Sequence, residues 1–275
     1  MYTNRDVVLR AVIAAYIKEL SGKLTFFNVH SETDIEKVSV PVFYAQMGQE
    51  LPYIEDYLDQ TEGDCGGSQS LPIPRGVLTV DSISINQAEE TGWATVEIPV
   101  TLDGKTLTVR SNCKMIPIKM STTLKVICSN HIELLKAIES AMSRIWPRSN
   151  AFRVNCMGFP IEAVFAPDSN YNRKFPIDIT KDTTDREYSI EMSMELSSVV
   201  PAFEYGVSLS EIYYIASRLF KDPSKADKLL EHPVLTLCRM DDGSLGYEWC
   251  GRMEKILVNL YDNEEFIKQY IIPQK

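Results

Sequence analysis

Long runs of alternating apolar and polar residues, two of them joined by an Asp-Gly pair, place the strongest constraint on the fold of this chain. Trp93 to Leu102 and Thr106 to Cys113 flank Asp103-Gly104-Lys105, and an Asp-Gly between alternating runs is a strong hairpin signal. Met115 to Ser129 continues as a long predicted strand, and Glu187 to Val200 alternates in the same way. The sequence therefore predicts an antiparallel sheet.

Shorter segments have the composition of further strands. In the early part of the chain Val38, Val40 and Val42 alternate with polar residues, while Pro41 favours an edge or a bulge because proline cannot donate to a strand ladder. The further predicted strands are Leu24 to Val29, Ile35 to Tyr44, Gly76 to Asn86, Phe152 to Met157 and Ile161 to Phe165.

Helical spacing of apolar residues appears in three places. The first helix is predicted over Asp6 to Leu20, with Asn4 as its N-cap, and a second over His131 to Trp146, ended by Pro147. The apolar residues that predict the second helix are Ile132, Leu135, Ile138, Met142 and Ile145. A third helix is predicted over Leu209 to Phe220 and a short one over Ala226 to Glu231.

These elements predict an α+β fold. We expect a mixed, mostly antiparallel sheet with two packed helices in residues 1–200, and a smaller C-terminal α/β lobe in residues 201–275 that contacts a partner or a neighbour. The glycine-rich segment Thr61 to Ser70 is predicted to be an exposed loop that reaches a neighbour or the lumen of a ring.

Composition narrows the class of protein. The chain has 28 Lys and Arg against 38 Asp and Glu, a formal net charge of −10, which disfavours nucleic acid as a general partner and leaves only a local basic patch open. Six cysteines lack CxxC spacing, which indicates reduced thiols in a cytoplasmic setting. No apolar run has the length of a membrane span or the form of a signal peptide.

The sequence lacks the motifs of common catalytic and metal sites. Gly104-Lys105-Thr106 is the nearest fragment to a phosphate-binding loop, and it is interpreted as a hairpin turn. Gly243-Ser244-Leu245-Gly246 has the wrong register for a nucleophile elbow and is also interpreted as a turn. None of His30, His131 and His232 has a second ligand at zinc spacing. We therefore expect no catalytic, cofactor-binding or metal-binding residues, no cofactor and no enzyme activity.

Two alternatives stay open. In the first, the protein is an enzyme whose distant residues converge on a pocket, for example around Cys128, His131 and Asp178. In the second, it is a binding module whose helix Leu209 to Phe220 docks in a groove of a partner. The Tyr213-Tyr214 pair and the Met192 and Met194 stripe are interpreted as core residues.

Four segments succeed one another in a familiar order. They are Val40-Pro41-Val42-Phe43-Tyr44-Ala45, Leu71-Pro72-Ile73-Pro74-Arg75, Pro117-Ile118-Lys119-Met120 and the helix ending at Trp146-Pro147. In this order the chain resembles the tail-terminator and sheath-stabiliser proteins of tailed bacteriophages, over roughly the first 200 residues. The segments are short and apolar, so their order carries the resemblance, and residues 201–275 have no counterpart in it.

The resemblance implies a structural virion protein. Its copies would close into a ring of six or twelve at the phage neck or tail, and the ring would connect portal or head-completion proteins to the tail. A collar ring of a short-tailed gut phage is also compatible with the resemblance. The implied partners are other copies of the chain and neighbouring neck, portal or tail proteins, with DNA only as cargo passing through the lumen and no membrane. Assembly would take place in the cytoplasm of the bacterial host.

Overall fold

The computed structural model describes residues 7–29, 35–45, 73–86, 91–102, 104–146, 150–168, 177–180, 187–221 and 231–255. Its helices are α1 (Val7–Lys23), α3 (His131–Arg144), α4 (Leu209–Lys221) and the 3-10 turn η2 (Glu204–Gly206). Its strands are β1 (Thr25–Val29), β2 (Ile35–Ser39), β3 (Val42–Tyr44), β4 (Arg75–Ile85), β5 (Ala94–Leu102), β6 (Lys105–Cys128), β7 (Asn150–Cys156), β8 (Phe159–Pro167), β9 (Ile177–Thr180), β10 (Glu187–Phe203), β11 (Val234–Arg239), β12 (Leu245–Trp249) and β13 (Arg252–Lys255).

Strand β6, with 24 residues, organises the main sheet. On one side it pairs with β5 as far as Cys113 and then with β4 from Ile118 onward, both antiparallel. On the other side it pairs with β11 in parallel and with β10 in antiparallel fashion along most of its length. The order β13-β12-β11-β6-β10-β8-β7 completes the path. The fold is therefore α+β with a mixed, mostly antiparallel sheet, as the sequence predicts.

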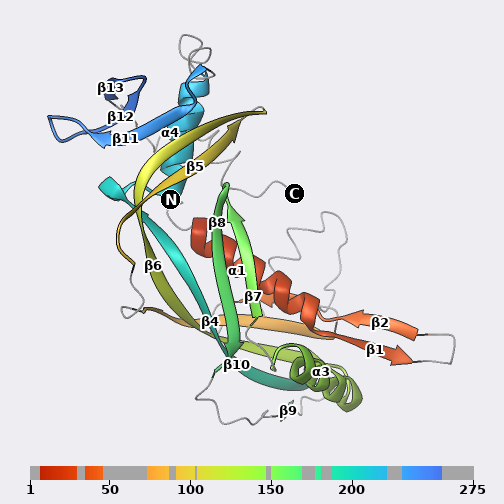
Figure 1. Ribbon diagram of the computed structural model, residues 1–275. Coiled ribbons are helices and arrows are strands. Elements are labelled where there is room, and N and C mark those ends of the chain that lie inside the picture. The colour runs from red at the N-terminus through yellow and green to blue at the C-terminus, as the bar shows by residue number, and fades with distance from the viewer. Residues whose placement is uncertain are drawn as a thin grey trace, which may run out of the picture.

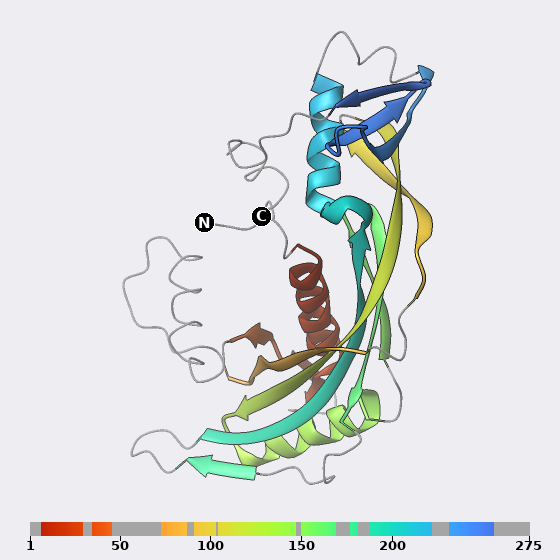
Figure 2. The ribbon, with the colours of Figure 1, turned by 90° about the vertical axis from the view of Figure 1, so that its left-hand side faces the viewer.

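The two halves of β6 bury opposite faces. In the first half the buried positions are odd-numbered, from Leu107 to Cys113, whereas in the second half they are even-numbered, from Ile118 to Val126. The pairing of β6 with β10 runs from Cys113 to Cys128 without a register shift, and successive side chains of a strand point to opposite faces. One ladder therefore supports two helical layers, which lie at different ends of the curved sheet in Figure 2.

Helices α1 and α3 cover the second half of β6. Helix α1 buries Val8, Val12, Tyr16 and Leu20, which recur every four residues and so form one stripe. Helix α3 buries the small residues Ala137, Ser140 and Ala141 together with Leu134, and small side chains allow it to approach the strands closely.

Helix α4 covers the other end of the sheet. It is buried over most of its surface between β5, β6 and the hairpin of β11 and β12, where Leu235, Leu237, Tyr247 and Trp249 join the same continuous core as α1. Figure 1 shows α4 and β11 to β13 together at the top of the molecule. The division of the chain near residue 200 stays a prediction, and β10 itself continues past that point to Phe203.

Several predicted elements are confirmed with different bounds. The predicted strands Thr106 to Cys113 and Met115 to Ser129 are one strand, β6, in which Pro117 is tolerated because it lies in the gap where β5 has ended and β4 has not begun. The predicted strand Ile35 to Tyr44 is divided into β2 and β3, with Pro41 between them. The predicted N-cap Asn4, the loop from Thr61 to Ser70 and most of the short helix predicted near residue 226 lie outside the described residues.

Among the helices in the described ranges, none is long and apolar enough to cross a membrane.

Candidate functional site

The residues of the enzymatic alternative lie at one end of the sheet. Cys128 ends β6 opposite Tyr188, and His131 begins α3 with its ring 6.1 Å from that of Tyr188. Asp178 lies in β9 opposite Ser189, the next residue along β10. The three residues therefore lie at the same end of the sheet, on β6, α3 and β9.

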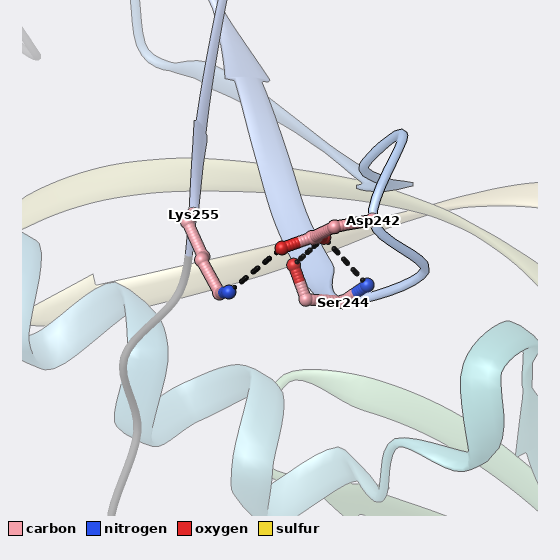
Figure 3. A network of polar contacts seen from close by, with 3 residues as sticks. All are labelled: Asp242, Ser244 and Lys255. Carbon is pink, nitrogen blue, oxygen red and sulfur yellow. Dashed lines mark hydrogen bonds and ion pairs between the residues drawn. The ribbon is translucent and has the colours of Figure 1, made fainter.

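The turns predicted from Gly104-Lys105-Thr106 and Gly243-Ser244-Leu245-Gly246 are both present. Gly104 has a positive φ of 76° in the hairpin between β5 and β6. In the hairpin between β11 and β12, the carboxylate of Asp242 accepts from the N–H and the hydroxyl of Ser244 and from the ammonium of Lys255 (Figure 3). These bonds, with that from Lys255 the largest cause, lower the pKa of Asp242 well below its ordinary value. The network closes a solvent-exposed turn.

Potential metal ligands do not come together in the residues that the structure describes. No group of three His, Cys, Asp or Glu side chains could hold a metal ion among these residues. His131 is exposed at the start of α3, and the carbonyl oxygen of His232 accepts a hydrogen bond from the indole N–H of Trp249 at 2.9 Å. His30 lies outside the described residues.

The core thiols are poorly suited to nucleophilic chemistry. Burial raises the pKa of Cys128 to about 12, with the charge of Glu133 adding to the shift. Burial also raises the pKa of Cys113 to about 11 and that of Cys156 to about 11. Because their pKa values are raised, these thiols are neutral near physiological pH. The thiolate is the reactive form of cysteine, so the neutral thiols react poorly.

We expect Cys113, Cys128 and Cys156 to resist alkylation in the native protein at pH 8, while the exposed Cys250 reacts readily. The reason is that the three core thiols are both inaccessible and protonated at that pH. Treatment with iodoacetamide followed by peptide mass mapping measures the modification, and a denatured sample should be modified at all four positions. Native modification of Cys128 as fast as that of Cys250 would contradict this assignment.

Several large apolar side chains are exposed, and two groups of three among them form the candidate site. On α3, Ile132 is 67% exposed, Leu135 49% and Met142 48%, and we call these three residues the α3 stripe. They are among the residues whose spacing predicts this helix, yet the face that packs on the sheet is formed by Leu134, Ala137, Ser140 and Ala141. Sequence periodicity thus identified the helix and could not tell its two apolar faces apart.

The second cluster lies where the chain passes from β4 to β5. Ile83 is 51% exposed, Ile85 58% and Trp93 58%, and we call these three residues the β4–β5 corner. The segment is held in place because the N–H of Asn86 donates to the carbonyl oxygen of Pro117 at 2.9 Å. The hydroxyl of Thr91 also hydrogen-bonds to the backbone of Met115.

Comparison with known proteins adds no family to this description. The sequence matches no protein-family model and no curated protein.

Proposed function

We propose that this protein is a structural subunit of a tailed-bacteriophage virion, and that its copies close into a ring at the neck or tail. The ring would connect portal or head-completion proteins to the tail, with DNA passing through its lumen. The observation that carries the proposal is the presence of two separate apolar clusters, the α3 stripe and the β4–β5 corner. Figure 1 shows the end of β4 on the left and α3 with the β1–β2 hairpin on the right.

Two different exposed apolar surfaces on one chain support head-to-tail association. When each copy contacts the next through a different surface, the assembly closes into a ring if the rotation between copies permits. Apolar clusters left exposed on a folded subunit are typical of protein-protein contacts. The two-stranded β1–β2 sheet adds exposed Phe27 and Ile35 on the same side as α3, and an isolated hairpin is only marginally stable in water.

Three of the ordered segments of the phage resemblance reach strands of the sheet: Val42 to Tyr44 form β3, Arg75 begins β4, and Pro117 to Met120 lie in β6. Val42 in β3 pairs with Gly76 at the start of β4, and further along β4 Ile85 pairs with Ile118 of β6. The strands β3, β4 and β6 are thus adjacent, although Arg75 itself pairs with Ile127 at the far end of β6. This arrangement supports the proposal without depending on residues 201–275.

The binding-module alternative through the predicted helix Leu209 to Phe220 meets a physical obstacle. The corresponding helix, α4, buries residues on all sides, including Ile212, Tyr214 and Ala216. To enter the groove of a partner, α4 would have to leave its own core. A contact of other parts of the lobe with a neighbour stays a prediction.

We expect the purified protein to form closed species of six or twelve copies at high concentration, measured by light scattering and native mass spectrometry. Negative-stain images of the large species should show rings. A protein that stays monomeric at high concentration and also fails to bind portal and tail proteins would contradict the proposed function.

A further inference from the structure

We propose that the α3 stripe of one copy docks on the β4–β5 corner of the next copy. This inference rests on the proposed ring function and names the contact that would build the ring. It follows from how each cluster is held and from what each leaves uncovered.

The α3 stripe is presented by a rigid helix. At the N-terminus, Asn130 accepts from the N–H of Glu133 at 2.8 Å, and the Glu133 carboxylate accepts from the N–H and hydroxyl of Ser129. The Asn130 side chain thus caps a backbone donor of the first turn, and Glu133 holds Ser129, the residue before the cap. On the inner face, Ser140 Oγ lies 2.8 Å from the carbonyl oxygen of Thr25 and accepts from the N–H of the same residue at 3.2 Å. A stripe fixed in this way loses little entropy when it binds.

At the β4–β5 corner, the sheet face that packs under α1 and α3 continues past the part that these helices cover. Before the bulge in β4, Leu78 lies opposite Leu124 of β6, and both are fully buried. The register shifts between Val80 and Ser82, so that Ile83 then lies opposite Met120. Residues directly opposite in a ladder share a face.

The bulge itself is fixed by the carboxylate of Asp81, which accepts from the hydroxyls of Thr79 and Thr123. Bulges re-aim the side chains that follow them. The bulge therefore turns Ile83 and Ile85 toward the face that α1 and α3 cover elsewhere in the sheet. In the part of the chain that the structure describes, no element covers these two side chains.

A second copy is the occupant that fits both observations. The corner is a part of the sheet on which no helix packs in the described residues. The α3 stripe is a face of a helix that packs on no sheet there. The stripe runs from Ile132 to Met142, about 15 Å of helix, which is long enough to cross the two isoleucines of the corner. Because copies with a net charge of −10 repel one another, apolar contacts must supply the attraction. One contact covers the stripe of one copy and the corner of the next, so each copy keeps a second cluster for a further neighbour.

The test uses two full-length variants, Leu135→Glu in the stripe and Ile85→Glu in the corner. Each places a charge at the centre of the contact, and we expect either change alone to weaken self-association about 100-fold. Both positions are half-exposed, so thermal unfolding should match that of the wild type. Met253→Glu in β13, which is 51% exposed but far from both clusters, is the matched control and should assemble normally.

Mixing the two variants separates the possible geometries. Each variant retains one intact surface, so a one-to-one mixture should form a heterodimer by native mass spectrometry and should grow no further. Dimers of Ile85→Glu alone would show that α3 pairs with α3, which overturns the proposal. If the wild-type protein assembles and neither variant weakens its assembly, the proposed contact is wrong but the proposed ring is not. A wild-type protein that stays monomeric at high concentration would also overturn the contact.

Discussion

Replacement of Tyr16 by alanine is expected to lower the free energy of unfolding by about 4 kcal/mol, the magnitude found when a large aromatic residue is removed from a core. Tyr16 is fully buried in α1, and its ring lies 4.9 Å from that of Phe165 in β8 and 6.4 Å from that of Phe152 in β7. Its hydroxyl is 3.2 Å from that of Thr122 in β6 and donates to the sulfur of Met194 in β10 at 3.5 Å. One side chain thus joins α1 to four strands, and its loss leaves a cavity among them.

The conservative variant Tyr16→Phe separates packing from hydrogen bonding. It keeps the ring contacts, and we expect it to cost only about 1 kcal/mol because Thr122 still donates to the carbonyl oxygen of Met194 at 3.1 Å. Denaturant unfolding followed by circular dichroism measures both variants, and Ile17→Ala on the half-buried side of α1 gives the comparison within the same helix. An alanine variant no less stable than the phenylalanine variant would show that Tyr16 does not hold the layers together.

The elements of the fold could largely be predicted from local patterns. Period-two alternation located β5, β6 and β10, and spacing of three and four residues located α1, α3 and α4. The turn at Asp103-Gly104 was predictable because its residue types favour the positive φ that a tight hairpin requires. These signals are local, so they depend little on how the rest of the chain is arranged.

The long-range organisation could not be predicted in this way. Alternation shows that β6 has two faces, but only the positions of α4 at one end and of α1 and α3 at the other decide which face is buried in each half. The bulge beside Asp81 changes the face of Ile83 and Ile85, and one inserted residue leaves no distinctive signal in a strand pattern.

The candidate site was hidden for a related reason. Helix α3 has two apolar faces, one of small residues and one of large residues, and hydrophobic spacing alone favours the large residues as the buried side. In the structure Ala137 and Ala141 are buried, while Ile132 and Leu135 are exposed. An exposed apolar stripe can therefore be recognised only after the true packing face is known.

Replacement of Gly158 by alanine is expected to destabilise the protein by about 3 kcal/mol, from backbone strain and steric overlap together. Gly158 lies in the turn between β7 and β8 with a φ of +79°. A Cβ atom there would be 2.7 Å from the carbonyl oxygen of Pro99 in β5 and 2.9 Å from the hydroxyl of Tyr213 in α4. That hydroxyl donates to the same carbonyl at 3.0 Å, so the added methyl group would have to displace a hydrogen-bonded pair.

The matched control for this change is Gly104→Ala. Gly104 also lies in a tight hairpin turn, with a φ of +76°, but a Cβ atom there would meet nothing within 4 Å. It should therefore show the cost of the positive φ alone, about 1 kcal/mol. The difference between the two variants, measured by denaturant unfolding, isolates the close approach of the β7–β8 turn to β5 and α4. Equal losses at both glycines would mean that this turn does not press against Pro99, and that β8 is not anchored to the end of the sheet covered by α4.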